Sequence, residues 1–313
     1  REQHQYDRAL QIYQKLLLQE RQNPEIRLRI GIAYIGQADR DSTFVDKAKP
    51  VFEQLNKDIP NDWRPCYYLG VIAARQVKDS VARGYFESVT RLAAWNGDAW
   101  WYLGSSYFER GEYQKLVDAM VKAEKALPKD FRMSFLLGLG YSRTDQNDLA
   151  ITAFRRSLDL KPDDINTLST LALTLDGLHR YQESDSLYER ALKVDPRSHL
   201  VMNNFGYSLS ERGLQLERAL QMSLQAIEAE PKNESYLDTV GWVYFKLGRY
   251  DEAQKYISKA IDAGGASATV YEHMGDIHFK MGEKKKAEQF WKQSLEMNSA
   301  NQSLKEKIAR GSL

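Results

Sequence analysis

Apolar residues recur along the chain at helical spacing, in two stripes separated by a short turn. Within residues 97–130, the first stripe occupies positions i, i+3, i+4 and i+7, namely Trp100, Leu103, Gly104 and Tyr107. This spacing places the four side chains on one face of a helix. A glycine then interrupts the pattern, as expected of a turn, and a second stripe ends before a proline, which cannot continue a helix interior. The segment therefore predicts a helix–turn–helix unit.

The same unit repeats at a nearly constant spacing of 34 residues, with a single gap of 35. A column of small residues in the first stripe marks it at Gly70, Gly104, Gly138, Ala172, Gly206, Gly241 and Gly275. The second stripe carries one bulky position, occupied by Phe52, Phe86, Phe154, Tyr188, Ile257 and Trp291. Small residues let helix axes approach closely, and bulky side chains fill the space between layers. The period predicts stacked units that bury their apolar faces against their neighbours.

These positions resemble the tetratricopeptide repeat, whose pattern is W-x2-L-G-x2-Y, then A-x3-F, A and P. One copy matches it at Trp100, Leu103, Gly104, Tyr107, Ala123 and Pro128. The resemblance implies an all-α fold, a right-handed superhelical α-solenoid, over residues 1–299, with an N-terminal half repeat and about eight full repeats. Residues 300–313 are expected to form a capping helix. Residues 37–43 predict a longer turn, and Gly264-Gly265 a flexible link.

Composition and charge narrow the possible partners. The 44 Lys and Arg residues nearly balance 43 Asp and Glu residues, which argues against a nucleic-acid partner. There is no run of 18 apolar residues, so no transmembrane span is expected in this chain. The single cysteine, Cys66, excludes an intrachain disulfide. The chain opens in what looks like the middle of a repeat, so we expect it to be a fragment of a longer protein.

No catalytic or metal-binding motif is present. The sequence lacks a Gly-x4-Gly-Lys-Ser/Thr phosphate loop and a His-Glu-x2-His metal pair. His273 and His278 lie five apart on one predicted helix, which does not place them on one face, so we interpret both as structural. Cys66 occupies a core position, and Lys284-Lys285-Lys286 is interpreted as a solvated helix start. We expect neither enzymatic activity nor a cofactor.

The resemblance implies that the first helix of each repeat lines a concave face. Candidate partner-binding residues lie on that helix beside the small column, aromatic in the first half and mostly polar or acidic in the second: Tyr67, Trp101, Phe108, Phe135, Asn203, Asn204, Tyr207, Asp238, Trp242, Phe245, Glu272, Asp276 and Phe279. Trp101 and Trp242 are the favoured anchors, because each sits beside the core position rather than on it. The two asparagines can donate and accept hydrogen bonds with a peptide backbone, and the carboxylates favour a basic segment of a partner.

The predicted function is a non-catalytic scaffold that binds a peptide or partner protein in its concave groove. Some chaperone adaptors of this family bind a C-terminal carboxylate with basic residues and an asparagine. Here the asparagines are followed by Asp238 and Glu272, whose negative charge would repel a carboxylate, so this clamp is not expected. The last copies are similar to repeats of bacterial envelope proteins, which favours a periplasmic lipoprotein adaptor for a protease or cell-envelope enzyme. The alternatives are a cytoplasmic co-chaperone-like adaptor, the substrate-recognition arm of an enzyme whose catalytic domain lies outside this chain, and self-association through the N-terminal half repeat.

Overall fold

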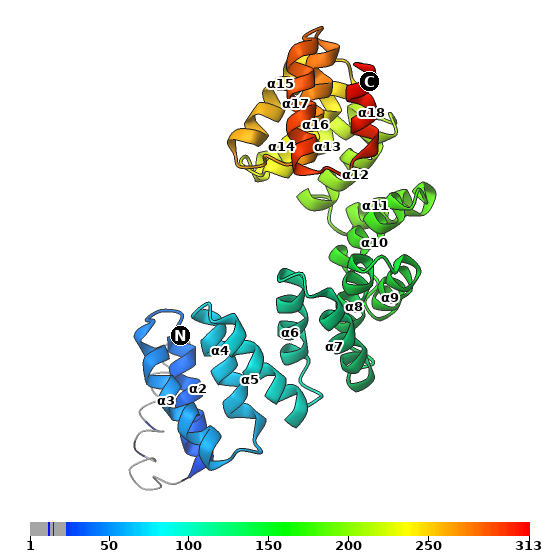
Figure 1. The fold of residues 1–313 in the computed structure, drawn as a ribbon. Helices are drawn as coiled ribbons and strands as arrows, with labels where there is room; N and C mark the ends of the chain where they lie inside the picture. The colour runs from blue at the N-terminus through cyan, green and yellow to red at the C-terminus, as the bar shows by residue number, and fades with distance from the viewer. Residues whose placement is uncertain (1–11, 13–14, 16–22) are drawn as a thin grey trace. The chain divides into compact units, whose positions relative to one another are not determined.

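The computed structural model describes residues 12, 15 and 23–313, and these form 17 α-helices without a strand (Figure 1). The chain divides into two compact units, with unit 1 ending at Pro162 and unit 2 running from Asp163 to Leu313. In each unit consecutive helices pack as pairs, a first helix and a second helix joined by a short turn. The expected N-terminal half repeat falls mostly on residues 1–11, 13–14 and 16–22, which lie outside the described part.

The part of unit 1 from residue 23 onward contains four helix pairs. Their bounds are α2 Pro24–Gln37 with α3 Thr43–Asp58, α4 Trp63–Arg75 with α5 Asp79–Leu92, α6 Gly97–Glu109 with α7 Tyr113–Ala126, and α8 Phe131–Arg143 with α9 Asn147–Leu160. The turn between α2 and α3 is longer than the next, as the sequence predicts. Asp41 orders it, because its Oδ1 accepts hydrogen bonds from the backbone N–H and hydroxyl of Thr43 at 2.9 and 2.7 Å.

Unit 2 contains four further pairs and one end helix. Their bounds are α10 Ile165–Gly177 with α11 Tyr181–Val194, α12 His199–Glu211 with α13 Leu216–Ala229, α14 Glu234–Lys246 with α15 Tyr250–Asp262, α16 Ala268–Lys280 with α17 Lys284–Met297, and α18 Gln302–Arg310. The first helices α10, α12, α14 and α16 contact one another in that order. Helix α18 covers the last pair, since Leu304 is fully buried in a cluster with Ala287 and Trp291.

Short polar residues start the first helices at the repeat spacing. A side-chain oxygen accepts a hydrogen bond from a backbone N–H of the first turn at Asp62, Asn96, Asp130, Asp164, Asn233, Ser267 and Asn301. Ser198 stands at the same place before α12 but makes no such bond. Each cap satisfies a donor that a helix N-terminus leaves unpaired, and typically stabilises the helix by about 1 kcal/mol.

The small column lies under the bulky position of the paired helix, as the sequence predicts. A Cβ added to Gly138 would lie 2.6 Å from the ring of Phe154, and one added to Gly275 would lie 2.3 Å from the ring of Trp291. Both rings are almost completely buried. The glycines are therefore required for the close approach of the two helices in a pair.

We predict that Gly275→Ala destabilises unit 2. The added methyl must displace Trp291, and it also approaches the carbonyl oxygen of Ala287 at 3.1 Å. Overpacking of this kind costs about 2 kcal/mol, and the better helix propensity of alanine offsets about 1 kcal/mol of it. Urea unfolding followed by circular dichroism measures the difference. The control is Gly177→Ala at the end of α10, where an added Cβ meets nothing within 4 Å and stability should not fall. Equal midpoints for both variants would contradict the prediction.

Candidate functional site

One position of the repeat, three residues before the small column, lies on the first helices of both units. In unit 1 it carries the aromatic residues Tyr67, Trp101 and Phe135. In unit 2 it carries Ser169, Asn203, Asp238 and Glu272. The change from apolar to polar side chains predicted by the sequence is therefore a change in one structural position. What differs from the prediction is how accessible these side chains are.

In unit 1 only Trp101 among the candidates is well exposed, at 36%. The ring of Tyr67 lies 5.9 Å from that of Phe86, and the ring of Phe135 lies 6.0 Å from that of Phe154. Burial accordingly raises the pKa of Tyr67. Tyr67 and Phe135 are half-buried and support the core, whereas Trp101 is available to a partner.

Phe108, the fourth candidate of unit 1, is half-buried and already has a cationic neighbour. The Arg143 guanidinium lies 5.5 Å from its ring centre, within cation–π range. The sequence interpretation missed an aromatic pair in the same unit, one member of which is exposed. Trp95, in the link before α6, is 61% exposed, and its ring meets that of Trp63 edge-on at 5.1 Å. The sequence did contain a signal for this pair, because Trp95 is a large aromatic residue in a segment that links two predicted helices.

Unit 2 contains a groove of ≈ 400 Å³, which we call the unit 2 groove. It brings together four predicted residues, Asn203, Asn204, Tyr207 and Asp238, from helices α12 and α14. The remaining lining comes from α10, from the start of α14 and α16, and from the link between α15 and α16: Leu173, Glu234, Ser235, Thr239, Gly264, Gly265, Ala266, Ser267, Thr269 and Val270. The irregular Gly264-Gly265 link therefore forms one wall of the groove.

The groove lining combines an apolar side chain with amide groups. Leu173 is 51% exposed and lies directly after Ala172, the small position of its repeat. Asn203 Nδ2 donates to Asn204 Oδ1 at 3.3 Å, and Asn204 Nδ2 donates to Ser169 Oγ at 3.4 Å. The Oδ1 of Asn203 is buried and has no hydrogen-bond partner. An amide carries both a donor and an acceptor, so Asn203 retains capacity for a ligand.

The groove is electrically negative. Burial raises the pKa of the Tyr207 hydroxyl, and the carboxylates of Glu211, Asp238 and Glu272 raise it further. Asp238 is only 9% exposed, because its Oδ1 lies 2.9 Å from Nδ1 of His273. The prediction of an openly accessible carboxylate is therefore wrong for Asp238, although it does line the groove.

Trp242 was expected to be an exposed anchor, and this expectation is wrong. The side chain is only 7% exposed. Its ring stacks on those of Phe245 and His273, with centroids 4.7 and 3.9 Å away, and its Nε1 donates to Glu211. Phe245 belongs to the same helix α14, whereas His273 and Glu211 come from the neighbouring first helices α16 and α12. A position that is free within one repeat is therefore covered by the repeats beside it.

The predicted acidic residues Glu272 and Asp276 are already occupied by the chain itself. Lys307 of α18 reaches them, with Nζ 2.8 Å from Glu272 Oε1 and 2.9 Å from Asp276 Oδ1. Trp291 Nε1 also donates to Asp276 at 2.8 Å. Asp276 is 6% exposed, so the expectation that it is open to a basic ligand is wrong. Phe279 is half-buried against Trp291, at 5.7 Å between ring centres.

His273, His278 and Cys66 are buried in the helix packing, in agreement with their interpretation as structural residues. His273 and His278 are each about 95% buried, and His278 Nδ1 lies 2.5 Å from Glu283 Oε2. Burial raises the pKa of the Cys66 thiol, whose Sγ lies 3.0 Å from Asn56 Oδ1. Among the described residues, no group of three His, Cys, Asp or Glu side chains is placed to hold a metal ion. None of the helices in this part of the chain has the length and apolar character needed to cross a membrane.

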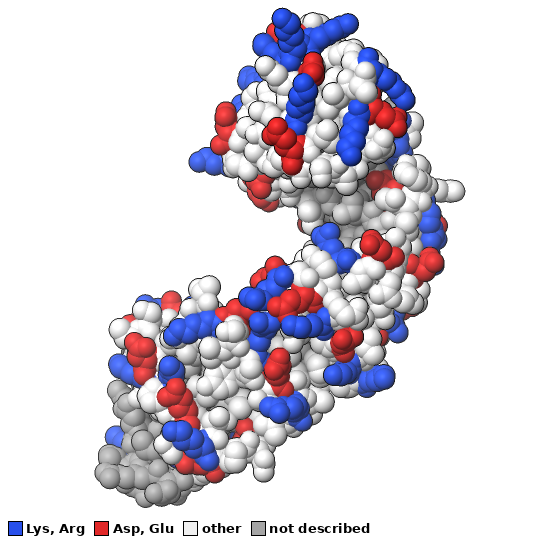
Figure 2. All heavy atoms as spheres, viewed as in Figure 1, with Lys and Arg blue, Asp and Glu red and all other residues white. Residues whose placement is uncertain are grey.

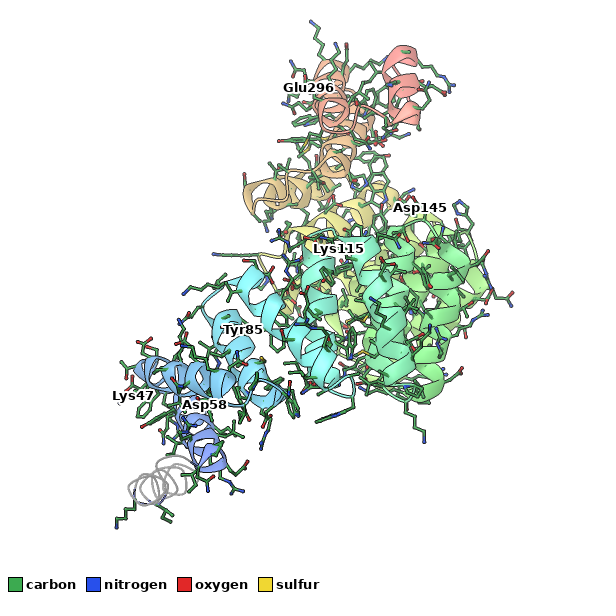
Figure 3. The ribbon with its side chains drawn as sticks, turned by 60° about the horizontal axis from the view of Figure 1, so that its bottom comes forward. Lys47, Asp58, Tyr85, Lys115, Asp145 and Glu296 are labelled. Atoms are coloured by element: carbon green, nitrogen blue, oxygen red, sulfur yellow. The ribbon has the colours of Figure 1, made fainter. Side chains whose placement is uncertain are left out.

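Charged side chains are spread over both units. On the face shown in Figure 2, basic and acidic side chains are interspersed over each unit. The second helices contribute exposed charges such as Lys47 of α3, Lys115 of α7 and Glu296 of α17 (Figure 3). This mixture agrees with the formal net charge of +1.

We predict that Lys307→Met destabilises unit 2 by about 3 kcal/mol near neutral pH, because it leaves buried carboxylates without their cation. Burial already raises the pKa of Asp276 despite Lys307, and loss of the ammonium raises it further. The penalty is complete above this raised pKa. It shrinks as the pH falls and the carboxyl group becomes protonated.

Urea unfolding at neutral and at mildly acidic pH measures this penalty. Lys305→Met, at an exposed position of the same helix, is the matched control and should leave stability nearly unchanged. A Lys307→Met penalty that equals the control, or that grows as the pH falls, would contradict the prediction.

Three segments of the chain match the family model of the tetratricopeptide repeat, at residues 131–164, 235–263 and 268–301. The TPR repeat-containing protein PA4667 of Pseudomonas aeruginosa is 24% identical over 120 residues, which are 38% of this chain and 20% of that protein. The type IV pilus assembly protein PilF of the same bacterium is 27% identical over 127 residues, 40% of this chain and 50% of that protein. The chain thus spans half or less of these relatives.

A solved structure of a tetratricopeptide repeat protein from Parabacteroides merdae has the same fold. It superposes with a TM-score of 0.63 over 80% of this chain and 98% of that chain, at 16% sequence identity. Tetratricopeptide repeats are generally non-catalytic scaffolds for protein–protein interaction, and the matches indicate no catalytic family. The helix pairs, the close contacts at the small column and these matches agree that the chain contains tetratricopeptide repeats.

Proposed function

We propose that the chain is a protein-interaction scaffold whose unit 2 groove binds an extended peptide segment of a partner protein. The observation that carries the proposal is the convergence of Leu173, Asn203, Asn204 and Tyr207 from two first helices on one groove. Its volume of ≈ 400 Å³ is within the range of ligand sites in proteins. The groove can therefore hold a few side chains of a peptide.

The chemistry of the lining suits a peptide. Leu173 provides exposed apolar area for a side chain of the peptide. The amides of Asn203 and Asn204 match the alternating donors and acceptors of a peptide main chain. Trp101 of unit 1 is the competing surface, because an exposed aromatic side chain is a frequent anchor of protein interfaces. The two surfaces are separable by mutation, since they lie on different units.

We predict that Leu173→Ser weakens peptide binding about tenfold, because removing one apolar contact of this size costs about 1.5 kcal/mol. Peptides are first selected from a random displayed library on the whole chain. Their affinities are then measured by fluorescence polarisation. Leu200→Ser is the matched control, because Leu200 is 44% exposed on α12 but does not line the groove. Its affinities should equal those of the parent chain.

Two outcomes would overturn the proposed site. One is an equal loss of affinity for Leu173→Ser and Leu200→Ser. The other is a loss for Trp101→Ala with no loss for Leu173→Ser, which would place the binding surface on unit 1. Failure of the library to yield any peptide that binds the parent chain would overturn the proposed function itself.

We further propose a bacterial cell-envelope setting, with the chain acting as a periplasmic adaptor. The similarity to the type IV pilus assembly protein PilF, over 40% of this chain, supports this setting. Fractionation of the cells that naturally make the chain tests it. The full-length product should be recovered with the envelope fraction, and recovery with the cytoplasmic fraction would contradict the proposal and favour a cytoplasmic adaptor.

A further inference from the structure

The first helices of unit 2, and the end helix α18 after them, are joined by hydrogen bonds at one fixed position, which we call lateral bonds. Each links the residue three before the small position of one repeat to a residue on the next first helix or, for the last bond, on α18. The bonded pairs are Ser169 with Asn204 at 3.4 Å, Asp238 with His273 at 2.9 Å, and Glu272 with Lys307 at 2.8 Å. In all three the partners are 35 residues apart.

The lateral bond is missing between α12 and α14. The residues at the two corresponding positions are Asn203 and Thr239. Thr239 instead donates its hydroxyl to the carbonyl oxygen of Ser235, one turn earlier in its own helix, at 3.0 Å. The Oδ1 of Asn203 is consequently left without a hydrogen-bond partner, although the residue is only 7% exposed. Both Asn203 and Thr239 line the unit 2 groove, so the groove lies where the bond is missing.

The orientation of the Asn203 amide identifies what is missing as a donor. Its Nδ2 donates a hydrogen bond to Asn204 Oδ1, and Asn204 Nδ2 in turn donates to Ser169 Oγ on α10. This chain of bonds leaves the carbonyl oxygen of Asn203 as the free group. A buried acceptor without a partner is unfavourable, and a ligand that brings an N–H or O–H group removes that penalty.

The charges around the groove favour a positively charged donor. Its lining contains two carboxylates, Glu234 and Asp238, and these lining residues include no Lys, Arg or His. At the next two lateral bonds the donor is a basic side chain, first His273 and then the ammonium of Lys307. The bond of Lys307 shows that an ammonium group fits the donor side of a lateral bond when the acceptors around it are carboxylates.

We propose that the unit 2 groove binds a primary ammonium group carried by a peptide, with Asn203 Oδ1 accepting one of its N–H bonds and the carboxylates of Asp238 and Glu234 balancing its charge. The ligand thereby completes the missing lateral bond. This inference rests on the proposed function, because it assigns the chemistry of a peptide already held in the groove. A lysine side chain and a free peptide amino terminus carry the same group, and the experiment separates them.

The test uses peptides selected on the whole chain and synthesised in four forms, with the lysine free or Nε-acetylated and the amino terminus free or acetylated. Acetylation removes the charge but preserves the rest of the peptide. We expect acetylation at one of the two places to weaken binding about tenfold, which identifies the source of the ammonium group. Asn203→Leu, a replacement of similar size, should remove most of this difference between the forms.

Unfolding of Asn203→Leu provides the control for folding. Stability should stay close to that of the parent chain, because the replacement removes the unpaired oxygen together with the hydrogen bond from Asn203 Nδ2 to Asn204. Thr239→Asn is a second variant, designed to supply the missing donor from the chain itself, and it should also reduce the effect of acetylation.

The inference is overturned if acetylation at neither place changes affinity, or if both Asn203→Leu and Thr239→Asn retain the full difference between acetylated and free forms. In either case a continued loss of affinity for Leu173→Ser would leave the proposed peptide groove intact. The failure of this inference is therefore distinguishable from the failure of the proposed function.

Discussion

The contact between a small residue of each first helix and a bulky residue of its partner is the constraint on which the rest of the structure depends. A helix pair of this size has too little interior to be stable alone, so it must also bury apolar area against the next pair. Gly275 and Trp291 show how little space this contact leaves, since one methyl group added at Gly275 would overlap the indole ring. The close contact orients each pair and thereby determines which residues of the first helix face the neighbouring repeat.

The polar residues of unit 2 follow from this arrangement. Because first helices lie next to each other, a residue three before the small position meets a fixed position of the following repeat. Asp238 and Glu272 are satisfied there by His273 and Lys307. Asn203 is not, because the short side chain of Thr239 bonds within its own helix. The recognition site that we propose lies where one member of this regular series lacks its partner.

Much of the architecture could be predicted because the same pattern of small, bulky and turn residues recurs in each repeat. The helix pairs, the turns and the buried position of Cys66 follow from the period and from the positions that must be small or bulky. The candidate site was only partly predictable. Asn203, Asn204, Tyr207 and Asp238 do come together, but Trp242 and Asp276 are buried by neighbours that the pattern of a single repeat does not reveal.

The sequence by itself determined the fold class, the helix pairs and the positions within each repeat that face a neighbour, because these depend on local periodicity and side-chain size. Only the tertiary structure decided which of those positions remain open. Exposure depends on what the adjacent helix presents, and that is a property of two repeats together. Trp101 stays exposed and Trp242 does not, although both hold inner positions of their first helices. The unpaired oxygen of Asn203 likewise becomes visible only when its three bonded counterparts are compared in space.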